Sequence, residues 1–196
     1  QGKPGHSSIP PQQTAIGVIA RAVALMDDNP MPPIMDFIIP LLRNVGQLLP
    51  FSLRFVIANA WLFRPILLRQ FRKLDQMNAM IRTTHAATMI EGGIKDNILP
   101  AVATATVNCR LLPGDTIQGA IDHFTKVIND PRVEVSIDRI SGGWEASIVS
   151  STNTPAYLSL DLVTRQVFNN VTVAPFAFLA ATDSRYYAPI CTNIYK

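Results

Sequence analysis

An asparagine and an arginine stand at the two ends of a strand-like segment in the middle of the chain. Asn97 lies in the loop that enters this segment, and Arg110 ends it. A side-chain amide and a guanidinium can both donate hydrogen bonds to the oxygens of a planar anion. The two residues therefore predict a clamp that holds the carboxylate of a substrate.

The residues before Arg110 alternate between polar and apolar, as they do along a strand that is buried on one face. The polar positions are Thr104, Thr106, Asn108 and Arg110, and the apolar positions are Ala101, Ala103, Ala105, Val107, Cys109 and Leu111. Turn signals stand at Gly92-Gly93 and at Pro113-Gly114. We therefore predict a hairpin of residues 83–91 and 98–112, with its polar face open to a ligand.

Three motifs follow one another along the chain. Residues 2–11 read GKPGHSSIPP, residues 91–114 contain the pattern EGGxxxNxxP followed by NCRxxPG, and residues 181–191 read ATDSRYYAPIC. In this order they resemble the zinc metallopeptidase family that includes carboxypeptidase S, aminoacylase and glutamate carboxypeptidase. GHSSIPP and a long insertion before the hairpin are similar to the carboxypeptidase S-like branch.

The resemblance implies a role for each candidate residue. His6 matches a histidine that reaches from the lid of one subunit into the partner's active site and stabilises the oxyanion. Asn97 and Arg110 match positions in the lid, and Arg185 matches an arginine that contacts the substrate carboxylate. The residues alone also allow simpler interpretations: a surface histidine, a turn-closing asparagine, and arginines paired with the nearby Asp115 and Asp183.

A complete zinc site is not visible in the sequence. Enzymes of this family hold two zinc ions with a His-x-Asp pair, an adjacent Glu-Glu pair, another acidic residue and a late histidine. The chain has His6, His85 and His123, but neither of these pairs, and Cys109 and Cys191 are isolated. We expect no cofactor in this chain, with the zinc-binding parts of the parent enzyme before Gln1 and after Lys196, and no catalysis by the chain alone.

The basic character of the chain does not predict nucleic-acid binding. The net charge is +3 and the pI is about 9.1, but the basic residues are scattered. Their densest group, Arg64, Arg69, Arg72 and Lys73, is typical of a solvated helix face. Two cysteines give no disulfide framework, so the sequence does not indicate a compartment.

Hydrophobic periodicity and turn residues predict the other elements. An apolar helical region, 31–80, is expected to break at Pro40, Pro50 and Pro65, and its charged residues argue against a transmembrane segment. The remaining predictions are helices at 12–28, 116–129 and 155–169, a closing strand at 132–140 and a buried strand at 171–178.

This order of elements predicts an α+β protein. Residues 1–141 would form a ferredoxin-like lid, an antiparallel sheet with helices on one face, with the helical insertion at about 31–80. Residues 142–196 would belong to an α/β catalytic domain. The lid is expected to self-associate through a sheet edge or its flanking helix, and so to form a homodimer.

The resemblance favours one function and leaves two others open. The chain would be the lid, dimerisation and carboxylate-binding part of a dizinc exopeptidase or N-acyl-amino-acid hydrolase, which acts on a peptide or an N-acyl amino acid with a free carboxylate. One alternative is a non-catalytic ferredoxin-like module that binds an amino acid. Another is an interaction module whose apolar helices pack on a protein or on a membrane surface.

Overall fold

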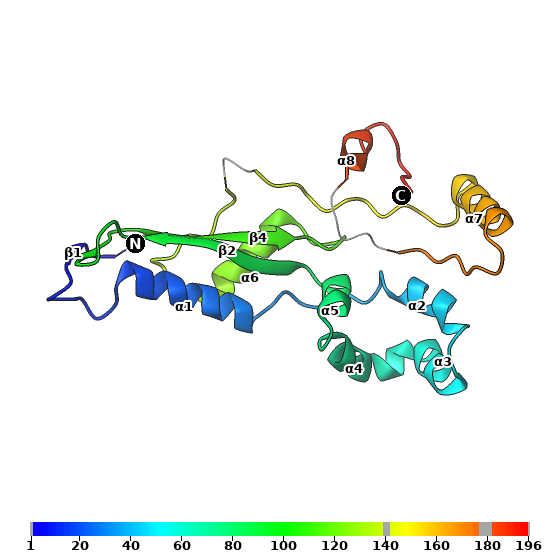
Figure 1. Cartoon of the computed structure of the whole chain (residues 1–196), viewed down its shortest axis with the longest axis horizontal. Helices are drawn as coiled ribbons and strands as arrows, with labels where there is room; N and C mark the ends of the chain where they lie inside the picture. The colour runs from blue at the N-terminus through cyan, green and yellow to red at the C-terminus, as the bar shows by residue number, and fades with distance from the viewer. Residues whose placement is uncertain (1, 139–141, 177–181, 196) are drawn as a thin grey trace. The chain divides into compact units, whose positions relative to one another are not determined.

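The computed structural model describes residues 2–138, 142–176 and 182–195 (Figure 1). Helices and short antiparallel sheets make an α+β chain that divides into two compact units. The first unit contains Gln1–Pro32 and Thr83–Glu145, and the second contains Pro33–Arg82 and Ala146–Lys196. The boundary after residue 141 and the assignment of 142–196 to a catalytic domain stay predictions.

A long hairpin forms the centre of the first unit. Strand β2 (Thr84–Gly92) runs antiparallel to β4 (Ala103–Arg110), with Thr84 opposite Arg110 and Gly92 opposite Ala103. The connection between them contains β3 (Ile98–Leu99), which pairs with β1 (Gly5–His6) as a second small sheet. The predicted hairpin is confirmed, except that residues 98–99 leave it to pair with β1.

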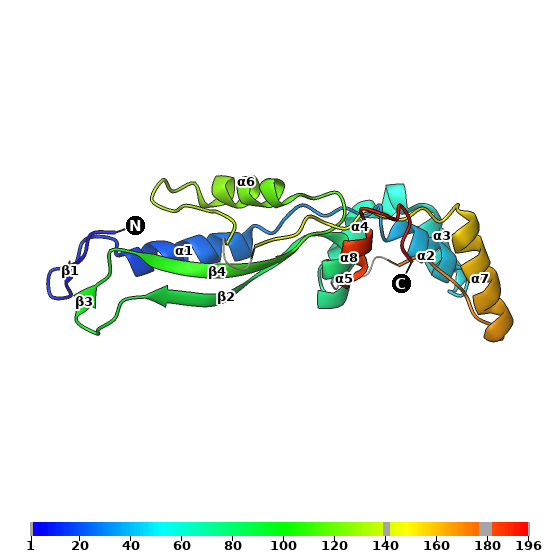
Figure 2. The ribbon, with the colours of Figure 1, turned by 90° about the horizontal axis from the view of Figure 1, so that it is seen from above.

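The predicted alternation along β4 is confirmed from Ala103 to Asn108, but Cys109, which was predicted on the apolar face, is exposed. Ala103, Ala105 and Val107 are half-buried, whereas the polar residues between them are exposed. Helices α1 (Ala15–Asp28) and α6 (Ile117–Ile128) cover the apolar face (Figures 1 and 2). The core between them contains Ala22, Met26, Met31, Ala120, Phe124 and Ile128, with Val107 and Leu111 packed against it.

Threonine caps fix where both helices begin. Thr14 Oγ1 accepts a hydrogen bond from the Gly17 amide at 3.1 Å, and Thr116 Oγ1 accepts one from the Gly119 amide at 3.0 Å. A capping side chain pairs an amide that has no partner inside the helix. The helix predicted for 116–129 therefore lies almost where the sequence placed it, and the one predicted for 12–28 begins three residues later.

One buried hydroxyl ties the start of β2 to the end of β4. Thr83 has no exposed surface. Its Oγ1 accepts a hydrogen bond from the Leu112 amide at 2.8 Å and donates one to Asp115 Oδ2 at 2.5 Å. These two contacts hold the Pro113-Gly114 turn against the hairpin.

Two predicted strands are wrong within the described residues. Residues 133–138 pair with no strand, and although Val133 and Val135 pack against the core, Ile137 is 41% exposed instead of inward. Residues 171–176 are not a strand either, and Phe176 is 53% exposed. Alternating apolar residues make an extended segment, but a strand also needs a hydrogen-bonded neighbour. The ends of both predictions, 139–140 and 177–178, lie outside the described residues.

The second unit begins with the helical insertion. Its elements are α2 (Ile39–Gly46), α3 (Phe51–Ala58), α4 (Ala60–Phe71) and α5 (Asp75–Ile81). A core of Met35, Ile38, Phe71 and Ile81 joins α4 and α5 to the chain before α2. The helical region breaks at Pro50 as predicted. Pro40 instead lies in the first turn of α2, with no helix at residues 31–38 for it to break, and Pro65 lies inside α4. The chain bends instead at Asn59, whose side-chain and backbone N–H groups both donate to the Phe55 carbonyl.

The rest of the second unit contains α7 (Pro155–Val167) and α8 (Ser184–Tyr187), and α7 buries no residue fully. Thr154 caps α7 at the Tyr157 amide, which confirms the helix predicted for 155–169. None of the described helices is alone long and apolar enough to cross a membrane. Only α3 and α4 taken together meet that criterion, and they meet at an angle of 109°.

We predict that Thr83→Val destabilises the whole protein by about 2–4 kcal/mol, because it leaves the buried Leu112 amide without an acceptor and Asp115 without a donor. Denaturant unfolding measures the effect. Thr83→Ser, which keeps the hydroxyl, should lose no more than about 1 kcal/mol. The exposed Thr104 provides the control Thr104→Val. Equal stability of the Thr83→Val and Thr104→Val variants would contradict the role assigned to the hydroxyl.

Candidate functional site

His6 is the last residue of β1 and is exposed. Its Nδ1 lies 2.8 Å from Ser8 Oγ and accepts a hydrogen bond from the Ser8 amide at 3.2 Å. Because an amide N–H only donates, the neutral imidazole carries its proton on Nε2. The loop thus holds the ring in the tautomer that presents an N–H donor on its far side. The sequence motif indicated His6 but gave no sign that Ser8 orients it.

Asn97 lies beside His6. The Asn97 carbonyl accepts a hydrogen bond from the Ser7 amide at 3.0 Å, and His6 stands opposite Ile98 in the small sheet. The Oδ1 atom of Asn97 is shielded from solvent and has no hydrogen-bond partner among the described residues. A shielded, unpaired amide oxygen is unfavourable, but this atom accepts hydrogen bonds and so cannot itself hold a carboxylate; only the Nδ2 group of Asn97 could donate to one.

Arg110 lies at the other end of the hairpin. The Gly2 amide donates a hydrogen bond to the Ala101 carbonyl at 2.7 Å. This bond keeps β1 near the Ala103 end of β4. Arg110 is seven residues further along β4, about 23 Å away at the usual rise of a strand. The structure therefore brings His6 and Asn97 together but not Arg110, and one subunit cannot place Asn97 and Arg110 on the same carboxylate.

The Arg110 side chain is exposed, and Asp115, its expected partner, accepts its hydrogen bond from Thr83 instead. No ion pair of Arg110 with any described residue is present. This cation is therefore available to an anion from solvent or from another chain.

Arg185 lies on α8 in the second unit and is half-buried. Its Nη2 donates to the Tyr186 hydroxyl at 2.8 Å, and the guanidinium lies 4.7 Å from the centre of the Tyr186 ring. Stacking on an aromatic ring orients the planar guanidinium. The contacts hold the group in one place, as a carboxylate-binding arginine requires.

The other two histidines are held by structural contacts. The His85 ring packs edge-on against Phe124 at 4.8 Å, and its Nε2 is 3.5 Å from Asp27 Oδ1. His123 Nε2 lies 2.9 Å from the Asn29 carbonyl. Both residues link α1 to neighbouring elements, in agreement with their interpretation as ordinary strand and helix residues.

The described residues do not fit a zinc site. They contain no group of three His, Cys, Asp or Glu side chains that could hold a metal ion. Desolvation raises the pKa of the Cys109 thiol, and no cluster of further ligands surrounds this cysteine among the described residues. Zinc needs three or four clustered ligands, which this part of the protein does not supply.

The chain is similar to known proteins in two comparisons. Residues 1–136 match the M20 peptidase dimerisation domain. Among curated proteins, the chain is 40% identical over 192 residues to the probable carboxypeptidase S-like 2 of Dictyostelium discoideum. The aligned region covers 98% of this chain and 37% of that protein. It is 36% and 34% identical to the N-fatty-acyl-amino acid synthase/hydrolase PM20D1 of Xenopus tropicalis and of Homo sapiens, with 98% of this chain and 38% and 39% of those proteins covered.

The chain thus spans about two fifths of the length of these curated relatives. No solved structure matches it. The matching domain covers more than half of the chain and includes His6, Asn97 and Arg110. The chain belongs to the M20 peptidase family and contains its dimerisation domain.

Proposed function

We propose that the whole protein hydrolyses the amide bond of a peptide or an N-acyl amino acid, and that this chain supplies its dimerising lid. The observation that carries the proposal is the donor tautomer of His6 next to Asn97. The names of the relatives describe a carboxypeptidase and an N-fatty-acyl-amino acid synthase/hydrolase. Substrates of both types carry a free carboxylate next to the amide.

His6 would donate its Nε2–H to the oxyanion that forms when the amide carbon is attacked. A fixed donor aimed at developing charge stabilises the transition state more than the substrate. The Ser8 amide supports this role because it keeps the proton on Nε2. Asn97 would donate from its amide group to the same substrate.

Arg110 and Arg185 would bind the substrate carboxylate. The length of β4 then implies that Arg110 and the His6–Asn97 pair on one substrate come from different subunits. Each active site would therefore be completed by the lid of the partner. The two zinc ions that the family resemblance implies would be held by residues of the whole protein outside those described here.

The outer edge of β2 is our proposed dimer contact. Within the described residues β2 pairs only with β4, and its residues from Ala86 to Gly92 are exposed. An open strand edge is a ready partner for the same edge of a second chain. Strand pairing across the dimer would extend the hairpin into the larger antiparallel sheet that a ferredoxin-like lid requires.

We predict that Met89→Lys with Ile90→Lys converts the dimer of the whole protein to a monomer, because paired edges would bring the added charges together. Met89 and Ile90 are 56% and 58% exposed. Sedimentation velocity measures the change. Ile94, which is 97% exposed and lies outside β2, provides the control Ile94→Lys. A dimer that survives the double change would place the contact on a flanking helix instead.

We predict that Arg110→Ala and Arg185→Ala each lower kcat/KM for a free-acid substrate by roughly 30-fold to several thousand-fold, and change hydrolysis of its carboxamide much less. A lost guanidinium leaves the carboxylate, but not the amide, without its charge partner. Steady-state kinetics on the matched pair measures the discrimination.

His6→Ala should lower turnover of both substrates, because an oxyanion forms in either case. Arg21→Ala, which removes an exposed cation from α1, controls for a general change of charge. If the arginine variants lose equally on acid and carboxamide, those arginines are structural and the carboxylate assignment is wrong.

A further inference from the structure

The helical insertion has an unusual charge pattern. Between Asp36 and Asp75 the chain contains six cations, Arg43, Arg54, Arg64, Arg69, Arg72 and Lys73, and no acidic residue. The whole chain has a net charge of only +3. This segment is therefore strongly basic in an otherwise nearly balanced chain.

Large apolar side chains are exposed on the same helices. Phe51 is 80% exposed, Trp61 is 78% exposed, and Leu62 and Ile66 are each 56% exposed. Phe51 packs against Phe55, with ring centres 6.4 Å apart, and Phe55 packs against the half-buried Phe63 at 5.9 Å. These contacts continue from α3 into α4 across the bend at Asn59. Among the described residues, α3 and α4 bury Ile57, Ala60 and Phe71, and the half-buried Leu67 and Leu68 pack against the core of the second unit.

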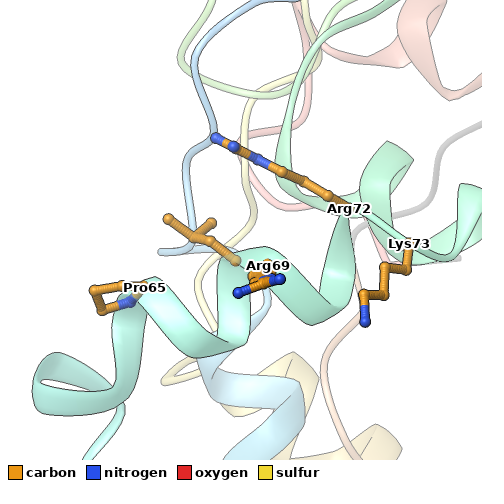
Figure 3. Close-up of a pocket in the computed structure, with 5 residues that line it drawn as sticks. Pro65, Arg69, Arg72 and Lys73 are labelled. Carbon is orange, nitrogen blue, oxygen red and sulfur yellow. The ribbon is translucent and has the colours of Figure 1, made fainter.

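A basic hollow lies along the second half of α4. Its volume is about 520 Å³, and its lining is Pro65, Leu68, Arg69, Arg72 and Lys73 (Figure 3). Three cations and two apolar residues are suited to a phosphate group with an attached hydrocarbon chain. No ion pair compensates these cations within the described residues.

A buried arginine near the hollow also lacks a partner. Arg82 is 4% exposed, and its Nε and Nη2 have no hydrogen-bond partner among the described residues. Burial, and then the charge of the nearby Arg72, lower the pKa of Arg82. A buried cation without a counter-charge is strongly unfavourable. The Arg72–Arg82 region therefore favours the arrival of an anion.

We propose that α3 and α4 bind the surface of an anionic phospholipid bilayer. The exposed aromatic and aliphatic residues would enter the region between headgroups and acyl chains, and the cations of the hollow would contact headgroup phosphates. The bend of 109° makes the pair suited to lie in the surface instead of crossing it. The absence of acidic residues from 37–74 matches the negative potential of an anionic leaflet.

Another part of the whole protein is the alternative occupant of this surface. A cover that buried these exposed cations would have to supply acidic partners for them, because the insertion supplies none between residues 37 and 74. A bilayer surface satisfies the apolar and the basic residues together. The proposal does not depend on the enzymatic activity, and binding alone tests it.

The test is sedimentation of the whole protein with vesicles of phosphatidylcholine alone and of about two parts phosphatidylcholine to one part phosphatidylserine. We expect binding to the mixed vesicles that weakens with added salt, and little binding to phosphatidylcholine. Changing Arg69, Arg72 and Lys73 together to Gln should weaken partitioning onto mixed vesicles roughly hundredfold. Phe51→Ser with Trp61→Ser should weaken it at least about tenfold.

Matched controls separate this surface from general effects. Changing Lys3, Arg21 and Lys126 to Gln removes the same charge from exposed positions elsewhere, and Ile94→Ser removes an exposed apolar residue. Neither control should change partitioning. The proposal is wrong if the protein does not bind the mixed vesicles or if the controls weaken binding equally. It is also wrong if Phe51→Ser with Trp61→Ser lowers the thermal unfolding midpoint by many degrees, because another part of the protein would then cover the surface.

Discussion

The length of one rigid strand determines how this chain can take part in chemistry. β4 is extended from Ala103 to Arg110, and an extended strand cannot bring its two ends together. His6 and Asn97 therefore share one end of the hairpin, while Arg110 occupies the other. If all three act on one substrate, a second subunit has to supply part of the site. Dimerisation would then be a requirement of catalysis, and the free edge of β2 would be as important as the side chains.

The rest of the first unit holds that strand in place. Helices α1 and α6 pack on its apolar face around Phe124, and Thr83 fastens the turn that follows Arg110. The polar face has no such cover among the described elements, so its residues remain accessible. The Ser8 amide orients the His6 ring by a hydrogen bond, and the Tyr186 ring and hydroxyl contact the Arg185 guanidinium.

Local signals in the sequence predicted the elements that depend on local physics. Helix α6 begins after the capping Thr116 and ends before Asn129, which has a left-handed backbone conformation. The alternation along β4 predicted the correct buried face. The strand error arose where a distant partner decides, because residues 133–138 are extended but lack a neighbouring strand. The error at Pro65 is local: α4 accommodates the proline, and the bend falls at Asn59, which donates twice to the Phe55 carbonyl.

The candidate site also divides into what local motifs predict and what the three-dimensional arrangement decides. Motifs in the sequence singled out His6, Asn97, Arg110 and Arg185 as candidates, and their roles stay predictions. Their spacing suggested that Asn97 and Arg110 form one clamp, whereas the structure places these two residues at opposite ends of the hairpin. The separation follows from the strand that connects them, which a list of matching residues does not reveal. Arg82 was missed, because nothing in its sequence context indicates a buried and unpaired guanidinium.

Mixed dimers of the whole protein test the central claim most directly. One subunit carries His6→Ala and the other carries Arg110→Ala, and each variant alone should be nearly inactive. If the two residues serve one substrate from different subunits, every mixed dimer contains one intact site and one doubly damaged site. Equal mixing after dissociation should then restore about a quarter of the wild-type turnover, because about half of the dimers are mixed. Activity that stays at the level of the separate variants, although the mixed dimers form, would contradict the account.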